Sequence, residues 1–200
     1  MAVTDILISP VNIYYAPVGT ANPDETSIDF DEAWGGNWVN LGYTTAPLTM
    51  QYDSEIFELE LEQITNPIKG QRTKESMMFE TTLAELTAAN LKLAMGSTST
   101  ITATAAGAGQ KGYQEFGFGG EVNLPIYKFG FEGFTLDANN NKLPVRIFVH
   151  RASFQLGGAL EFSKKAAAGI PLQIRTWPDT TQAAGALLAL FQKVTAVATT

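Results

Sequence analysis

The stretch that decides the fold is Glu55-Ile-Phe-Glu-Leu-Glu-Leu-Glu-Gln-Ile64. In an extended chain, Phe57, Leu59 and Leu61 fall on one side and Glu58, Glu60 and Glu62 fall on the other. Strict alternation over this length predicts a β-strand. Carboxylates spaced about 7 Å apart along one strand face need water, so the glutamate face is expected to be solvated.

A second alternating segment follows at residues 74–83, where Met77, Phe79 and Thr81 oppose Met78, Glu80 and Thr82. The two segments together predict a long hairpin over residues 55–83, and Glu80 is expected to join the wet face. Pro67 and Gly70 favour a loop between the strands, at residues 65–74.

The predicted loop holds the first basic residues of the chain, which are Lys69, Arg72 and Lys74. Residues 1–68 hold eleven Asp or Glu and no Lys or Arg, whereas residues 69–200 carry a net charge of +4. Two readings of the loop remain open. It is either a solvated hairpin tip or an element that docks on the acidic surface of another copy.

The rest of the chain predicts a single mainly β domain over residues 1–200, an antiparallel sandwich or barrel of two packed sheets with a flanking helix. A helix is expected at about residues 83–95, with Thr82 as its N-cap, Glu85 completing a capping box and Gly96 ending it. Residues 178–200 are expected to form a C-terminal arm, in which Asp179 could cap a last helix. Further strands are expected at residues 11–16, 38–41, 47–53, 101–105, 113–118, 125–134, 143–154, 159–162 and 170–176.

The composition excludes several classes of chemistry. The chain has no cysteine, so it can form neither disulfides nor thiolate metal sites. The charged fraction of 16% is low, which is typical of a surface that another subunit covers. The first residues lack a basic segment, and the longest apolar run, residues 183–191, is about half a membrane span. We therefore expect a protein made in the cytoplasm, without membrane contact.

No catalytic, cofactor-binding or metal-binding residues are predicted. The segment Gly107-Ala-Gly-Gln-Lys-Gly112 matches a dinucleotide-binding pattern in letters, but the residues after it favour a strand rather than a helix. His150 is the only histidine. In one extended strand, its spacing of three from Ser153 places the two residues on opposite faces. A carbohydrate-active or adhesive module remains a less favoured alternative.

The hairpin and the helix after it resemble the tail tube, or major tail, proteins of siphovirus-type long-tailed phages. The resemblance is carried by Leu41-Gly-Tyr-Thr44, Pro47-Leu-Thr-Met-Gln-Tyr-Asp53, Glu55–Ile64, Pro67-Ile-Lys-Gly-Gln-Arg-Thr73 and Thr82-Leu-Ala-Glu-Leu-Thr-Ala-Ala-Asn-Leu91. The secreted tube proteins of type VI secretion systems share this architecture and form the alternative reading.

The resemblance implies two orthogonal sheets flanked by a helix, and hexameric rings in which the long strands join around a channel. Stacked rings would conduct DNA at ejection without binding it specifically. Partners would be further copies of the chain and the tape-measure, tail-tip and tail-terminator proteins, and the location would be the virion tail. Glu58, Glu60, Glu62 and Glu80 would face the lumen. Pro67, Lys69, Arg72 and Lys74 would form an inter-ring contact.

Overall fold

A computed structural model describes residues 9–164 and 168–197 of the chain. The fold is mainly β, with 47% of residues in strands and 4% in a helix. The predicted fold class is therefore confirmed. In chain order the elements are β1 (Asn12–Pro17), β2 (Val39–Asn40), β3 (Thr49–Leu61), β4 (Ile64–Leu83), α1 (Ala88–Ala94), β5 (Thr102–Thr104), β6 (Tyr113–Glu115), β7 (Ile126–Leu136), β8 (Lys142–Leu156), β9 (Ile170–Thr176) and β10 (Ala189–Lys193).

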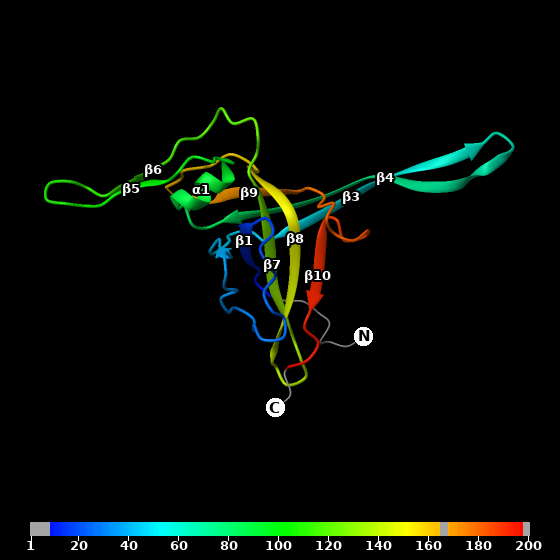
Figure 1. The fold of residues 1–200 in the computed structure, drawn as a ribbon, viewed down its shortest axis with the longest axis horizontal. Coiled ribbons are helices and arrows are strands. Elements are labelled where there is room, and N and C mark those ends of the chain that lie inside the picture. Colours follow the sequence, from blue (N-terminus) through cyan, green and yellow to red (C-terminus); the bar gives the residue numbers. More distant parts are fainter. Residues whose placement is uncertain (1–8, 165–167, 198–200) are drawn as a thin grey trace.

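Eight strands form one antiparallel sheet that bends into two layers at β8. The strand order is β2-β1-β7-β8-β9-β4-β3, and β10 also pairs with β8. The first part of β8 pairs with β10 and its last part with β9. As a result β1, β7, β8 and β10 run across β9, β4 and β3 (Figure 1). Within the described residues the sheet does not close into a barrel.

The main hydrophobic core lies between these two layers. Phe79 of β4 and Phe131 of β7 bring their ring centroids to 4.5 Å across the interface. Helix α1 adds Leu93 and Ala94 to the same core. Fully burying one such large side chain contributes about 1.5–3 kcal/mol. The remaining buried members are Ile13, Leu41, Leu83, Phe129, Val149, Ala152, Phe154, Ile170, Leu172 and Ile174.

The outer face of β7 and β8 is covered by residues 20–37, which we call the strap. Trp34 of the strap stacks on Tyr14 of β1, with ring centroids 4.0 Å apart, and also packs on Phe148 of β8. A Cβ at Gly130 would lie 2.1 Å from the Trp34 ring, so only glycine fits beneath it. This segment is polar in sequence, yet it forms part of the folded body.

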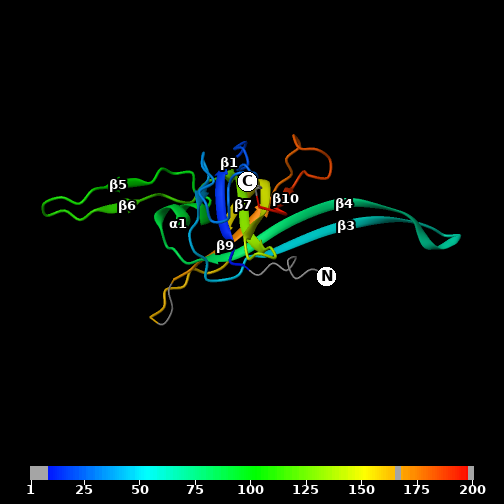
Figure 2. The same cartoon turned by 90° about the horizontal axis from the view of Figure 1, so that it is seen from below.

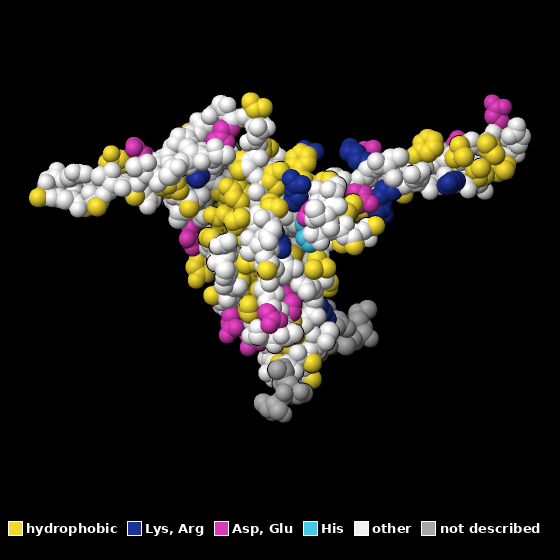
Figure 3. All heavy atoms as spheres, viewed as in Figure 1, with side chains coloured by type: hydrophobic (Ala, Val, Ile, Leu, Met, Phe, Trp, Pro, Cys, Tyr) yellow, Lys and Arg dark blue, Asp and Glu magenta, His cyan; other side chains and the backbone are white. Residues whose placement is uncertain are grey.

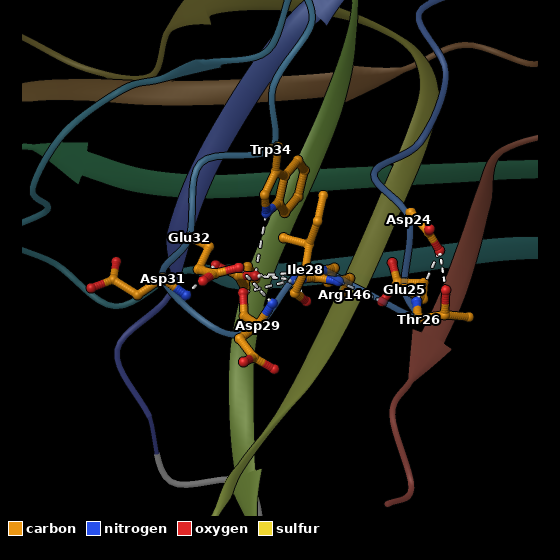
Figure 4. Close-up of polar contacts among 10 residues, drawn as sticks. Asp24, Glu25, Thr26, Ile28, Asp29, Asp31, Glu32, Trp34 and Arg146 are labelled. Atoms are coloured by element: carbon orange, nitrogen blue, oxygen red, sulfur yellow. Dashed lines mark hydrogen bonds and ion pairs between the residues drawn. The ribbon is translucent and has the colours of Figure 1, made fainter. Parts of the chain in front are cut away.

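A buried ion pair fastens the strap to the sheet (Figure 4). Glu132 and Arg146 are paired across β7 and β8, and both side chains are fully buried. Arg146 donates to Glu132 Oε1 from Nε at 2.9 Å and from Nη2 at 2.8 Å, and from Nη1 to Glu25 Oε2 at 2.6 Å. Arg146 also donates to the carbonyl of Ile28, and Trp34 Nε1 donates to Glu132. These bonds satisfy charges that would otherwise be costly to bury.

The helix begins later than the sequence predicts. Thr82 stays in β4, where it pairs with Pro171 of β9, and therefore caps nothing. Thr87 is the N-cap instead, and its hydroxyl accepts a hydrogen bond from the Asn90 amide at 3.1 Å. Gly96, with φ of +61°, follows the helix end as predicted. Continued pairing with β9 outcompetes the earlier capping box.

The last helix predicted after Asp179 is wrong. Asp179 instead accepts hydrogen bonds from the Thr181 amide and hydroxyl in a local turn. Residues Ala189–Lys193 are strand β10, which pairs with Val145–Val149 of β8. β9 pairs only with the C-terminal part of β8, so the same edge of β8 is free at its N-terminal part to pair with another strand. The strand expected at residues 159–162 does not form; these residues are irregular.

The buried ion pair generates a stability prediction. Replacing Glu132 with Ala should lower the free energy of unfolding by roughly 3–5 kcal/mol, because it leaves the Arg146 charge buried without its partner. The matched control is Glu55→Ala, which removes an exposed partner of Lys74 and should cost less than about 1 kcal/mol. Denaturant titrations of the unassembled subunit measure both values. Equal losses would show that the ion pair does not anchor the strap.

Candidate assembly interface

The β3–β4 hairpin is longer than predicted and has a tighter turn. β4 begins at Ile64, directly after a turn at Glu62 and Gln63, so the loop predicted at residues 65–74 is wrong and these residues are strand. The pairing shifts between Leu61↔Ile64 and Leu59↔Lys69, which leaves residues 65–68 in a bulge. Pro67 fits there because a bulged residue need not donate a ladder hydrogen bond.

Much of this hairpin stands free of the body. β9 pairs with β4 only from Met78 to Leu83, so residues 54–75, which we call the arm, have only each other as strand partners. Every residue of the arm is exposed. The 13 residues of β3 span about 40 Å at strand rise. The arm projects to one side of the body, and the smaller β5–β6 hairpin projects to the other (Figures 1 and 2).

The two ribbon faces of the distal arm differ in chemistry. β3 carries no inserted residue in the arm, so its side chains alternate between the faces. One face holds Phe57, Leu59 and Leu61 of β3, with Ile64 opposite Leu61; we call this the apolar face. The other holds Glu58 and Glu60 and is the acidic face. The alternation read from the sequence is therefore present in the register.

No residue in the described part of the chain covers the apolar face. Its four side chains are between 41% and 58% exposed. Hydrophobic side chains gather near the distal end of the arm in the space-filling view (Figure 3). A two-stranded ribbon cannot bury its own faces, and clustered exposed apolar side chains mark an interaction surface.

The four glutamates expected to act together lie in three settings. Glu58 and Glu60 share the acidic face, and Glu62 lies in the turn. Glu80 lies at the base of β4 opposite Thr49, which puts it on the other ribbon face, where its Oε1 accepts from Gln173 at 2.7 Å. A two-stranded ribbon twists strongly along its length, so side chains far apart on opposite faces can still turn toward one side of an assembly.

The three basic residues of the arm differ in their partners. Lys74 Nζ lies 3.0 Å from Glu55 Oε1, and Arg72 binds Glu75 on its own strand. Lys69 lies opposite Leu59, on the apolar face, and makes no ion pair with any described residue. Lys69 is thus the basic side chain of the arm that stays available to a partner.

His150 and Ser153 do not form a pair of a base and a hydroxyl nucleophile. His150 and Ser153 make no hydrogen bond to each other, and Ser153 Oγ instead accepts from Trp177 Nε1 at 2.9 Å. Burial lowers the pKa of His150. Within residues 9–164 and 168–197, no group of three or more potential ligands is arranged to bind a metal ion. No described helix is long and apolar enough to cross a membrane.

The strap network escaped the sequence analysis, although one signal was visible. In Lys128-Phe-Gly-Phe-Glu-Gly-Phe134 the phenylalanines at 129 and 131 alternate with Lys128, Gly130 and Glu132. A glycine inside a central strand can mark a place where another segment approaches closely, so Gly130 was the available signal that this face is covered.

Comparison with known protein families gives one match over most of the chain. The family model described as phage tail tube protein matches residues 6–188. A sequence search of curated proteins finds no match.

The exposed apolar face predicts that the arm adds little to the stability of the isolated subunit. Replacing Phe57 with Ala should change the free energy of unfolding by no more than about 0.5 kcal/mol, as for other surface positions. Replacing the buried Phe79 with Ala should lower it by roughly 3–5 kcal/mol. Denaturant titration at a concentration too low for association measures both. A large loss for Phe57→Ala would mean that the apolar face packs within its own subunit.

Proposed function

This chain belongs to the phage tail tube protein family, and from this premise we propose that its copies form hexameric rings that stack into a hollow tube. Membership in the family makes the chain a structural component of the virion tail. The ring size, the conduction of DNA at ejection and the siphovirus type of tail are parts of the proposal. Assembly in the host cytoplasm belongs to it as well.

The observation that carries the proposal is the free arm. A strand pair this long, with bare edges and an exposed apolar face, is stable against aggregation only when another chain pairs with it or covers it. The low charged fraction of the chain agrees with extensive contact between copies. We infer that the long strands of neighbouring copies join into a continuous wall around a channel.

The placement of the two projections supports a closed ring. The arm and the β5–β6 hairpin extend from opposite sides of the body (Figures 1 and 2). A contact that uses different surfaces on the two partners generates a ring when the rotation closes. Each copy can then reach its neighbour on one side while it is reached from the other.

The acidic face, Glu62 of the turn and Glu80 supply the lumen in this proposal. Glu58, Glu60 and Glu62, with Glu80 joining through the twist of the ribbon, would present carboxylates to the channel. Duplex DNA gains affinity for a protein when cationic groups replace its counterions, so an acidic wall offers it no binding site. DNA would pass without specific contacts, while tape-measure, tail-tip and tail-terminator proteins would bind within and at the ends of the tube. No catalytic step is part of this function.

The arm can be removed cleanly to test assembly. Ser54 and Glu75 pair across the hairpin, so an Asn-Gly turn inserted between them replaces residues 55–74. The shortened chain should fold as a monomer, because the core lies elsewhere, and should form no rings or tubes. Light scattering and negative-stain microscopy measure this against the wild-type chain, which should assemble.

A matched control keeps the arm but changes its acidic face through Glu58→Gln and Glu60→Gln. This variant should still assemble, since it leaves the apolar face intact. Tubes from the shortened chain would contradict the proposal, as would a wild-type chain that stays monomeric at high concentration with a tail initiator present.

Charge reversal of the acidic face and of Glu62 in the turn tests the lumen. Phages that carry Glu58→Lys, Glu60→Lys and Glu62→Lys together should assemble tails but eject DNA more slowly, most clearly at low salt, because lysines bind phosphates with salt-dependent strength. Replacing the same residues with Gln should have a milder effect. Ejection kinetics followed by dye fluorescence at several salt concentrations would refute the lumen assignment if the Lys variant matched the wild type.

A further inference from the structure

The β5–β6 hairpin is a second ribbon that stands free of the body. Among the described residues, β5 and β6 form a separate two-stranded sheet and pair only with each other. Every residue from 105 to 115 is exposed. A two-stranded ribbon alone is at best marginally stable in water, so it gains stability when another surface packs on it. This hairpin therefore has the same need for a partner as the arm.

One face of the β5–β6 hairpin combines an aromatic side chain with an unpaired charge. Tyr113 and Glu115 are two residues apart in β6, so their side chains lie on the same face. Tyr113 is 54% exposed, and Glu115 makes no ion pair with any described residue. Lys111, also exposed, precedes Tyr113 by the same two-residue step and follows the turn at residues 107–110. Tyrosine is enriched at protein interfaces.

The arm carries the complementary pattern on the ribbon face that holds its apolar side chains. Glu55, Phe57 and Leu59 alternate onto this face of β3, and Lys69 lies opposite Leu59. Phe57 thus lies between an acidic position towards the base of the arm and a basic position towards its tip. In both ribbons the two charged positions are four residues apart along the strand, which is about 13 Å at strand rise.

The directions of the two projections place opposite charges together. The arm and the β5–β6 hairpin point in opposite directions from the body (Figures 1 and 2). When two copies in a similar orientation overlap through these ribbons, the base of the arm meets the tip of the hairpin. Glu55 then lies near Lys111, and Lys69 lies near Glu115. Glu55 already contacts Lys74, but its carboxylate is exposed and can accept a second donor.

The acidic residues of the strap fit Lys69 less well, because their carboxylates have partners in their own subunit. Asp31 accepts a hydrogen bond from Asn12 at 3.0 Å, and Glu32 accepts one from the Asp29 amide at 3.1 Å. The strap also lies on the body, whereas the β5–β6 hairpin is a projection that the arm of another copy can reach.

We propose that the apolar face of the arm of one copy packs on the β5–β6 hairpin of a second copy, with Phe57 against Tyr113 and Lys69 paired with Glu115. The second charge pair forms in the same register. This inference rests on the proposed function, because it requires copies to assemble through the arm. It adds the surface that covers the apolar face and gives the β5–β6 hairpin a role in assembly.

Exchange of the charges tests this contact. Lys69→Glu alone and Glu115→Lys alone each place like charges together, so each should raise the protein concentration needed for tube formation by at least about tenfold. Both residues are exposed, and the variants should fold normally. The two substitutions in one chain should restore assembly. A mixture of the two single variants should also assemble, because an altered arm can then meet an altered hairpin. Light scattering and negative-stain microscopy over a series of concentrations measure these effects.

The matched control combines Lys69→Glu with Glu161→Lys. Glu161 is exposed in the loop between β8 and β9, and this variant has the same net charge as the restored one, yet it should stay defective. Single variants that assemble like the wild type, a double variant no better than the singles, or rescue by Glu161→Lys would overturn the inference and leave the proposed function standing. Failure of the wild-type chain to form tubes would instead count against the proposed function.

Discussion

A ribbon of two strands has two faces and no means of covering either, and this constraint shapes the molecule. The register of β3 and β4 holds Phe57, Leu59, Leu61 and Ile64 on one face of the arm, and no described residue outside the arm covers them. Apolar groups exposed in a cluster favour association. The body does not depend on the arm, since its core lies between β7–β8 and β4–β9. Folding and assembly can therefore use separate parts of one hairpin.

The body achieves this independence by covering both faces of β7 and β8. The inner face packs in the core, and the outer face is closed by the strap through Trp34 and the Glu132–Arg146 pair. Arg146 also binds Glu25 and the carbonyl of Ile28, so one buried network holds the strap against the sheet.

Local sequence patterns predicted a strand correctly where no pairing with a distant segment favoured another structure. The alternation at Glu55–Ile64 predicted β3, and β9 lies where residues 170–176 predicted a strand. Prediction failed where pairing between distant segments decided the outcome. Thr82 belongs to β4 because it pairs with β9. Residues Ala189–Lys193 form a strand because they pair with the free edge of β8. Pro67 led to the prediction of a loop, because the local sequence does not show that a proline can lie in a bulge of a continuing strand. The strap network forms only when the strap, β7 and β8 come together, and the sequence of one segment does not predict that contact.

In the assembled tail, we propose, another copy buries the apolar face of the arm. The most direct measurement is a cryo-electron microscopy reconstruction of the tube at a resolution that shows side chains. We expect Phe57, Leu59 and Leu61 in contact with a second subunit, with Glu58 and Glu60 facing water. A tube in which the apolar face is exposed to solvent, or in which the arm folds back on its own body, would contradict the proposal.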